Sequence, residues 1–585
     1  MRPSARKWIL LLAALSIGAG AVWSVGPVNA LREEKGLVLP PLPKTIRPSM
    51  LLTPMLALGR APLVDYLWIR ATTLKEEGRY FDAYQLSEMI CELQPKFGAV
   101  WGFQGWNMAY NISVTCKTPE ERWRWVRNGY ELIRDRGIPL NPNNTQLYRE
   151  LAWILFHKVG DYMDEMHNYY KLQFALIMED ILGDAPPEYH RDGRVPGDYY
   201  RDYDFASLAA MPRTYEELIK DPSVKDFADK VSAFGFDASQ PGLFLGLLKG
   251  LVDGTVQIPN APEHLRETRL VEFKALMNDP ATAAARGALE RFWRADRLRT
   301  EVKLEPQRIV DIQNGFGVSL DWRLPEAHAL YWANLGLEKG LDSATAIDVH
   351  KLNTNRIEFF CLQKMFYRGR MAMSPSANLG EPPYYGPDIR MAKVLFNAYL
   401  EDSREYLKDE NQNSPVSINF VTGFVGFVRT AIVRYHELGM QKEAQEFYDF
   451  ISSTYPDPIY EGGLDKFLAR QFAYDRKNPD LPKVISRIEG LIQRGLIQYG
   501  YGEDEEAIRY LNRAREVFNL YRSDLSSKRL DIPRTFPELV TQNLERLGPR
   551  LYKGTYDVIR RKLGLTAEGS AAPADGSEAA SRPAA

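Results

Sequence analysis

Cysteine is scarce in this chain of 585 residues, and its positive and negative charges nearly cancel. The three cysteines, Cys91, Cys116 and Cys361, form no C-x-x-C pair, which excludes haem attachment or a zinc site of that kind. Cys91 and Cys116 would be able to pair in an oxidising compartment, but we expect free thiols packed as small hydrophobic groups. With a net charge of −2 the chain has no overall attraction for nucleic acid, so we expect no nucleic-acid partner.

Motifs of catalysis are also missing. The chain has no G-x-x-x-x-G-K-[ST] phosphate loop, no G-x-S-x-G nucleophile turn and no H-E-x-x-H metal motif. One continuous helix would place His157, Asp161, Asp164 and His167 on one face, where they would be able to hold a metal. Gly160 lies between them where a turn is expected, so we predict that the four residues fall on two separate segments and hold no metal. Because no catalytic motif is present, we also predict no cofactor and no enzymatic activity.

An acidic stretch keeps one enzymatic alternative open. Residues 184–204 combine carboxylates with aromatic side chains, and a carbohydrate-active enzyme needs two carboxylates, one of them held protonated. Such a pair would come from this stretch, which we otherwise interpret as a solvated loop. Its acidic residues are Asp184, Glu188, Asp192, Asp198, Asp202 and Asp204.

The N-terminus has the features of a membrane anchor. Arg2, Arg6 and Lys7 precede an uncharged stretch from Trp8 to Ala30, which is about long enough for a bilayer that needs roughly 20 residues. Positive charge before the stretch and balanced charge after it predict a single-pass anchor in the cytoplasmic membrane, with the bulk of the chain on the periplasmic side. Residues 28–30 fit a signal cleavage site, so a soluble exported protein is the alternative.

Small residues recur at fixed offsets along the rest of the chain. A glycine is followed five residues later by an alanine, and the alanine is followed twelve residues later by a proline. The full pattern occurs twice, and a third copy lacks the proline. Glycine accepts the backbone angles of a short turn, alanine lets two helices cross closely, and proline ends the second helix. The sets are Gly78, Ala83 and Pro95; Gly439, Ala444 and Pro456; and Gly502 and Ala507.

These offsets resemble the tetratricopeptide repeat, a helix–turn–helix unit of about 34 residues. Adding that period to Leu67 and Ala71 gives Trp101 and Gly105, residue types that fit the first helix of the family's unit. The chain is also similar to large membrane-anchored repeat proteins of planctomycete-type bacteria, in the blocks 76–84, 101–113, 120–126 and 321–333. That group has no assigned activity, so the resemblance implies stacked helical hairpins and no particular chemistry.

We predict an all-α protein, because strand signals are scarce and apolar residues recur at helical spacing. The expected architecture is a degenerate tetratricopeptide-like α-solenoid of helical hairpins with irregular helical insertions and an N-terminal membrane anchor. A clear helix is expected near Ala281–Arg299. The predicted parts are an anchor (1–30), a proline-rich spacer (31–62), N-terminal repeats (63–182), a helical insertion with the acidic loop (183–324), C-terminal helical repeats (325–565) and a disordered tail (566–585).

The tetratricopeptide resemblance implies a concave face lined by the first helix of each unit. Aromatic rings with Arg and Lys among them are typical hot spots for a protein segment. The predicted function is therefore a scaffold that holds a protein partner in the cell envelope, and an accessory subunit of a transport or secretion complex is a further alternative. The predicted partner-binding residues are Trp68, Lys75, Trp106, Tyr110, Arg149, Trp153, Arg429 and His436.

Overall fold

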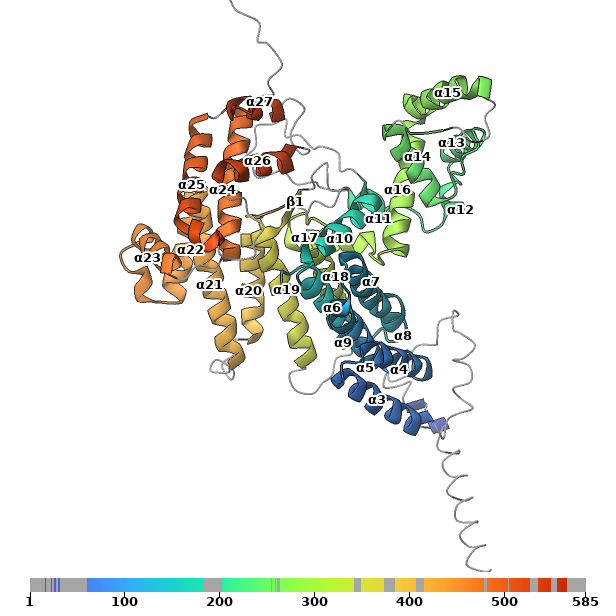
Figure 1. The fold of residues 1–585 in the computed structure, drawn as a ribbon, viewed down its shortest axis with the longest axis horizontal. Helices are drawn as coiled ribbons and strands as arrows, with labels where there is room; N and C mark the ends of the chain where they lie inside the picture. The colour runs from blue at the N-terminus through green and yellow to red at the C-terminus, as the bar shows by residue number, and fades with distance from the viewer. Residues whose placement is uncertain are drawn as a thin grey trace, which may run out of the picture.

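The computed structural model of the chain consists almost entirely of helices (Figure 1). The residues that it describes are 60–183, 203–253, 255–257, 259, 263–340, 349–372, 384–406, 415–477, 481–502, 504–526, 535–548 and 555–565, with a few positions before residue 32. Within these ranges the strands are β1 (Arg370–Ala372) and β2 (Tyr384–Gly386), which pair antiparallel with Met371 opposite Tyr385. The prediction of an all-α protein is confirmed.

The N-terminal part is a series of helices joined by short turns. α3 (Arg60–Glu76) packs on α4 (Tyr80–Leu93), and α5 (Gly98–Trp106) packs on α4, α7 (Pro119–Leu132) and α9 (Thr145–Trp153). Three of these helices widen into a π-helical turn before they end. The continuations are η1 (Asn107–Ile112) and α6 (Ser113–Thr115) after α5, η2 (Ile133–Gly137) and α8 (Ile138–Leu140) after α7, and η3 (Ile154–Val159) after α9.

Three glycines form the turns between paired helices, as their spacing predicts. Gly78, Gly439 and Gly502 have φ angles of 76°, 74° and 85°, in the left-handed region that favours glycine. They join α3 to α4, α21 (Pro415–Glu437) to α22 (Gln441–Thr454), and α24 (Leu481–Tyr501) to α25 (Asp504–Ser526). The alanines five residues later, Ala83, Ala444 and Ala507, are each 0% exposed. The spacing therefore identified real turns and real helix contacts.

The helices α5 and α7 cross so closely that no side chain fits between them. A Cβ atom on Gly105 would lie 2.5 Å from Ile133 Cδ1 and 2.8 Å from the carbonyl oxygen of Gly129. A Cβ atom on Gly129 would in turn lie 2.6 Å from the carbonyl oxygen of Gly105. The backbone oxygens have little freedom to move, because they belong to the helices themselves.

Replacing Gly105 with alanine should therefore destabilise this crossing. Alanine favours a helix over glycine by roughly 1 kcal/mol, but overpacking against backbone costs about 1–3 kcal/mol. Gly102→Ala is the matched control on the same helix, since its new Cβ would meet Glu150 Cγ at 3.4 Å, an ordinary contact. Hydrogen exchange of the α5 and α7 amides should speed up in G105A and stay level or slow in G102A. Equal behaviour of the two variants would contradict the close crossing.

Residues 160–324 interrupt the series of paired helices. α9 packs mainly against α18 (Pro325–Lys339) and α19 (Val349–Arg368), although α10 (His167–Leu182) follows it in sequence. α12 to α16 form an arm that projects from the rest of the molecule (Figure 1) and has its own buried cluster around Phe227, Phe273 and Trp293. The bounds in this region are α11 (Phe205–Ala209), α12 (Tyr215–Leu218), α13 (Pro222–Ser232), α14 (Pro241–Asp253), η4 (Glu263–Leu265), α15 (Arg266–Asn278), η5 (Pro280–Thr282), α16 (Ala283–Thr300) and α17 (Pro306–Phe316).

The helix expected near residues 281–299 is present as α16, and it connects two cores. Phe292 and Trp293 belong to the arm's cluster, whereas Ala295 and Leu298 belong to the large central cluster. A third cluster, with Ile488 and Ile492 of α24 among its members, holds the C-terminal helices together. The remaining bounds are α20 (Met391–Tyr406), η7 (Pro458–Tyr460), α23 (Leu464–Lys477), α26 (Phe536–Leu547) and α27 (Thr555–Lys562).

The three cysteines are as the sequence predicted, whereas the membrane anchor and the compartment stay predictions. Cys91, Cys116 and Cys361 are free thiols, as expected, and Cys91 and Cys361 are buried. In the described part of the chain, no helix is both long enough and apolar enough to cross a bilayer. The predicted anchor (1–30) and most of the spacer (31–62) lie outside the described residues except for isolated positions, and the tail (566–585) lies outside them entirely.

One histidine of the central core makes the stability of the fold depend on pH. His328 is 3% exposed, its Nε2 donates a hydrogen bond of 2.9 Å to the carbonyl of Trp322, and its ring lies edge-on to Phe174 at 4.7 Å. Burial disfavours the imidazolium and lowers the pKa of His328 to about 3. Below its ordinary pKa of about 6.5, the unfolded chain binds a proton that the folded chain does not, so stability falls as pH falls from that value towards 3.

The stability advantage of the wild-type chain over His328→Gln should therefore shrink in acid. We expect the difference in unfolding free energy to decrease by about 2 kcal/mol between pH ~7.5 and pH ~5, because a single group contributes roughly 1.4 kcal/mol per pH unit. Urea unfolding of both chains at the two pH values measures this difference. A difference independent of pH would show that the ring accepts a proton in the folded state.

Candidate partner-binding surface

A row of ring side chains runs across α3, α5 with its continuation η1, and α9 with its continuation η3. Its members are Trp68 of α3; Phe103 and Trp106 of α5; Tyr110 of η1; His157 of η3; and Trp153 of α9. We call these six residues the aromatic row. Each member is partly exposed, so the row is neither a buried core nor a set of freely solvated rings.

Ring contacts link the members of the aromatic row. The ring centroids of Trp68 and Phe103 are 5.1 Å apart, and those of Trp106 and Tyr110 are stacked at 5.2 Å. His157 lies 5.9 Å from Tyr110 and stacks on Trp153 at 4.9 Å with an interplanar angle of 11°. These separations fall in the range of favourable aromatic pairs, about 4.5–7 Å, so each ring restrains its neighbour.

A lysine connects the two halves of the aromatic row. The Nζ atom of Lys75 lies 4.5 Å from the ring centroid of Trp106 and 5.5 Å from that of Phe103. An ammonium group within about 6 Å of a ring face is attracted by the ring's negative quadrupole. Lys75 therefore bridges two rings and places a positive charge within the row.

His157 is held neutral in the aromatic row. Its Nδ1 lies 3.2 Å from the hydroxyl of Tyr110, and burial is the main cause that lowers the pKa of its ring. Asp161 opposes this shift, because a nearby carboxylate favours the charged ring. The row consequently offers flat faces and one hydroxyl–imidazole hydrogen bond, with the positive charge supplied by Lys75.

The π-helical turns set the positions of Tyr110 and His157. In η1 the amide of Ser113 bonds to the carbonyl of Met108, and in η3 the amide of Gly160 bonds to that of Leu155, five residues back in each case. A π-helical turn rotates the residues that follow it relative to an α-helix, and such turns are frequent at functional sites. Sequence spacing alone gave no sign of these turns.

Five of the eight predicted partner-binding residues lie in or on this surface: Trp68, Lys75, Trp106, Tyr110 and Trp153. Arg149 is on the same helix as Trp153 but pairs with Glu150 at 2.5 Å. Arg429 belongs to α21, where it donates to the hydroxyl of Tyr460 at 2.7 Å and pairs with Asp457 at 3.0 Å. His436, also of α21, lies 3.2 Å from Gln441 Oε1. The structure does not bring these last two to the aromatic row.

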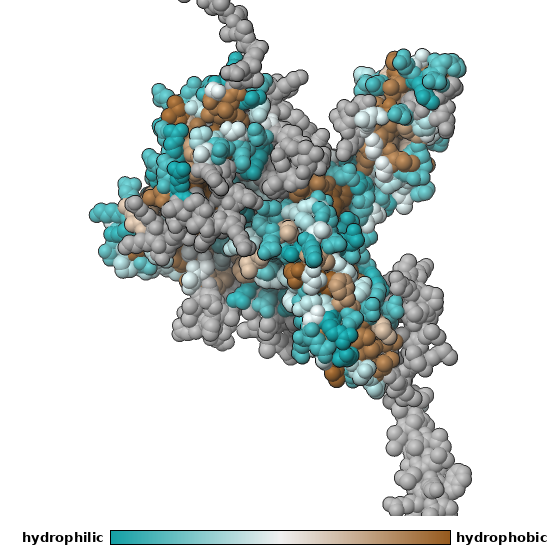
Figure 2. Space-filling model, viewed as in Figure 1, coloured by the Kyte–Doolittle hydropathy of each residue, from teal (hydrophilic) through white to brown (hydrophobic). Residues whose placement is uncertain are grey.

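Apolar surface gathers at the same end of the molecule. Figure 2 shows apolar colour over the end formed by α3, α4 and α5. Contiguous exposed apolar surface on a folded protein commonly marks an interaction site. The large exposed side chains there are Leu63, Tyr66, Ile69, Phe81, Met89 and Phe97.

The four residues weighed as metal ligands are separated, as the glycine between them predicted. His157 lies within η3, Asp161 and Asp164 lie in the turn after Gly160, and His167 begins α10. The two carboxylates are paired with lysines: Asp161 with Lys364 at 2.7 Å and Asp164 with Lys158 at 2.5 Å. Over the ranges that the structure describes, no group of three or more His, Cys, Asp or Glu side chains is placed to hold a metal ion.

Asp164 instead stabilises the turn between Gly160 and α10 by accepting several hydrogen bonds. Burial raises the pKa of its carboxyl, but hydrogen bonds from Lys158, the Met166 amide and the Tyr170 hydroxyl outweigh burial, and the net pKa is lowered. Lys158 also lies over the ring of Tyr110, 5.3 Å from its centroid. The carboxylate is therefore ionised and structural, and it holds the Lys158 side chain that lies over the ring of Tyr110.

The acidic stretch considered as a catalytic loop falls largely outside the described residues. Asp204 is the exception, and it caps α11 by accepting a hydrogen bond of 3.0 Å from the Ser207 amide. Capping accounts for this carboxylate, since a side-chain oxygen at that position satisfies an otherwise unpaired helix amide.

Phe103 is the member of the aromatic row that the sequence did not single out. It precedes Trp106 by three residues, so helical spacing places both on one face of α5. This offset of three residues was the sequence signal that would have identified Phe103.

In comparisons with known proteins, no family model, no curated protein and no solved structure matches this chain.

Proposed function

We propose that this protein is a scaffold that binds an extended segment of a partner protein along the aromatic row. The observation that carries the proposal is the row itself: six partly exposed rings on three helices, in two groups of contacting rings that Lys75 connects. Trp, Tyr and cationic side chains in preformed positions dominate the energy of protein interfaces. Rings that already restrain one another also lose little conformational entropy on binding.

The proposed architecture behind this surface is a degenerate tetratricopeptide-like solenoid. Its support is the repeated turn glycine with positive φ and the buried alanine five residues later, found at Gly78, Gly439 and Gly502. In such an array the first helices of successive pairs share one face, and under this proposal α3, α5 and α9 would be those first helices. Under this proposal the face is concave, and the aromatic row lines it.

The proposed location is the periplasmic side of the cytoplasmic membrane. Its support is the sequence before residue 31, with positive charge followed by an uncharged apolar stretch. An anchored scaffold would hold its partner near the membrane, and the proline-rich residues 31–62 would act as a spacer.

Crosslinking in cells tests this proposal, because Lys75 gives an amine-reactive crosslinker a handle within the surface. The full chain carries a C-terminal tag, and crosslinked peptides from the membrane fraction are identified by mass spectrometry. One partner in stoichiometric amount, joined to residues between 68 and 157, supports a scaffold. A chain recovered alone and soluble outside the membrane, with no partner above background, contradicts both the function and the location.

A further inference from the structure

A pocket lies inside the central core, between helices from distant parts of the sequence. Its walls come from α7 with η2, α9 with η3, α10 and α18, and the residues just after α16 close one side. The empty space is about 480 Å³ including the part open to solvent, and the enclosed part has room for about two water molecules. The aromatic row contributes no residue to this pocket.

The inner side of the pocket is apolar and aromatic. Leu151 of α9 is 0% exposed, Tyr130 of α7 is 3% exposed, and Phe174 of α10 and Trp332 of α18 are each 5% exposed. Rings and a leucine side chain around an enclosed space favour an apolar occupant, because it exchanges water for apolar contacts on every side.

The outer side of the pocket carries charges that already have opposite partners. Arg127 and Glu301, both 46% exposed, mark this side as the open one. The ion pairs there are Arg127 with Glu131 at 2.9 Å, Arg134 with Asp135 at 2.6 Å, and Arg297 with Glu301 at 2.6 Å. A charged ligand would lose its hydration without meeting an unbalanced charge, so the pocket suits a neutral molecule.

His328 presents a hydrogen-bond acceptor to the pocket. Its Nε2 donates to the carbonyl of Trp322 at 2.9 Å, and the ring is neutral, so Nδ1 carries a lone pair and no proton. Nδ1 makes no hydrogen bond to any residue that the structure describes. The side chain is 3% exposed, and Phe174 fixes the ring by an edge contact at 4.7 Å. A buried acceptor without a partner is uncommon in a folded protein and calls for an explanation.

We propose that this pocket binds a small neutral molecule with an apolar body and one hydroxyl group, which donates a hydrogen bond to Nδ1 of His328. Carboxylates, phosphates and ethers have no proton to donate at neutral pH, and an ammonium group would bring an unpaired charge. A hydroxyl is also compact enough for the enclosed part of the pocket. The apolar body would lie against Leu151, Ile177 and Trp332. Since the walls come together only in the folded core, the ligand would stabilise the packing of α7, α9, α10 and α18.

Three probes with the same fluorinated ring test the hydrogen bond on the full chain. The hydroxyl of para-fluorophenol donates, the oxygen of para-fluoroanisole only accepts, and the methyl group of para-fluorotoluene matches a hydroxyl in size but does neither. Fluorine NMR measures the affinity of each probe. We expect one saturable site for para-fluorophenol, with an affinity at least about 10-fold higher than that of the other two, because these leave the buried acceptor unpaired.

Substitutions test whether the probes bind in this pocket. Ile177→Trp fills the pocket from α10 and keeps His328, so it should abolish binding. Leu176→Trp is the matched control, because Leu176 is the preceding residue of α10, is also partly exposed and does not line the pocket. His328→Phe keeps a ring of similar size without the acceptor, and should erase the preference for para-fluorophenol over para-fluorotoluene.

Three results would overturn the proposal. One is an affinity for either analogue that equals the affinity for para-fluorophenol, and another is binding that survives I177W in a chain that melts normally. The third is no saturable binding, which would mean that water alone fills the pocket. The probe series uses the unmodified chain, so it decides the question whether or not H328F folds. These outcomes are independent of whether a protein partner binds the aromatic row.

Discussion

Replacing Trp106 with alanine should lower the affinity for the protein partner by about 30-fold or more. A central tryptophan of an interface typically contributes at least ~2 kcal/mol when truncated, and about 1.4 kcal/mol is a factor of ten in affinity. Trp106 stacks on Tyr110 at 5.2 Å and carries Lys75 at 4.5 Å from its ring centroid. Its removal therefore takes away one ring of the proposed surface and frees the two side chains that it positions.

Trp125→Ala is the matched control for this experiment. Trp125 lies on α7, is also partly exposed, and contacts the edges of Phe81 at 5.6 Å and Tyr84 at 5.7 Å without belonging to the aromatic row. Partner binding is measured with purified chains, and circular dichroism reports whether each variant keeps its helices. If W125A weakened the complex as much as W106A while both stayed folded, the aromatic row would not be the binding surface.

Replacing Arg323 with alanine should lower the stability of the central core by about 3–5 kcal/mol. Arg323 is 1% exposed and pairs with Glu179 of α10 at 2.6 Å and with Asp321 at 2.7 Å. It also donates to the carbonyl of Met371 in β1 at 2.8 Å. Removing one partner from a buried ionic group costs about 3–5 kcal/mol, because the carboxylates lose their compensating charge.

Two further variants define what Arg323 contributes. Arg323→Lys keeps the charge but not the planar fork that reaches three segments at once, so it should recover only part of the stability. Arg213→Ala removes an ion pair with Glu305 at 2.7 Å on a side chain 65% exposed, and should cost at most about 1 kcal/mol. Thermal unfolding ranks the three variants. An R323A chain as stable as R213A would show that the buried ion pairs of Arg323 contribute little to the stability of the fold.

The sequence predicted the features of this fold that depend on neighbouring residues. A glycine, an alanine and a proline at fixed offsets describe one turn and one helix crossing, which is local information. Gly78, Gly439 and Gly502 therefore lie where expected, and so does the close crossing at Gly105. Five of the eight predicted binding residues lie on the surface formed by these first helices for the same reason.

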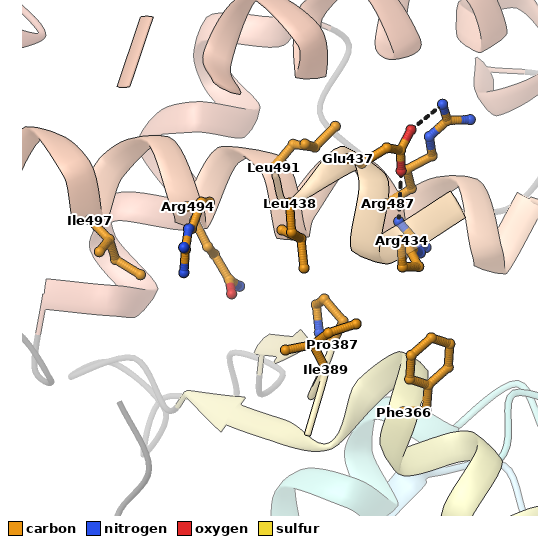
Figure 3. Close-up of a pocket in the computed structure, with 12 residues that line it drawn as sticks. Phe366, Pro387, Ile389, Arg434, Glu437, Leu438, Arg487, Leu491, Arg494 and Ile497 are labelled. Atoms are coloured by element: carbon orange, nitrogen blue, oxygen red, sulfur yellow. Dashed lines mark ion pairs between the residues drawn. The ribbon is translucent and has the colours of Figure 1, made fainter. Parts of the chain in front are cut away.

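The features that depend on distant residues were not predictable from spacing. Nothing near α9 in the sequence indicates that α18, more than 150 residues later, is the helix that packs against it. Phe366, Pro387, Glu437 and Arg487 line one pocket (Figure 3), and their proximity arises only when the central and C-terminal cores meet. Arg429 and His436 were assigned to the binding surface by analogy between repeats, but the structure places them in other contacts.

A photoreactive residue placed beside the aromatic row tests the central claim most directly. Thr72 lies on the same face of α3 as Trp68 and Lys75, because it is four residues after the first and three before the second. Val271 of α15 is 67% exposed and lies on the projecting arm, outside the row. If the row binds a partner segment, p-benzoylphenylalanine at 72 should yield one discrete crosslinked protein in cells, and the same residue at 271 should not. The same product from both positions, or from 271 alone, would contradict the account.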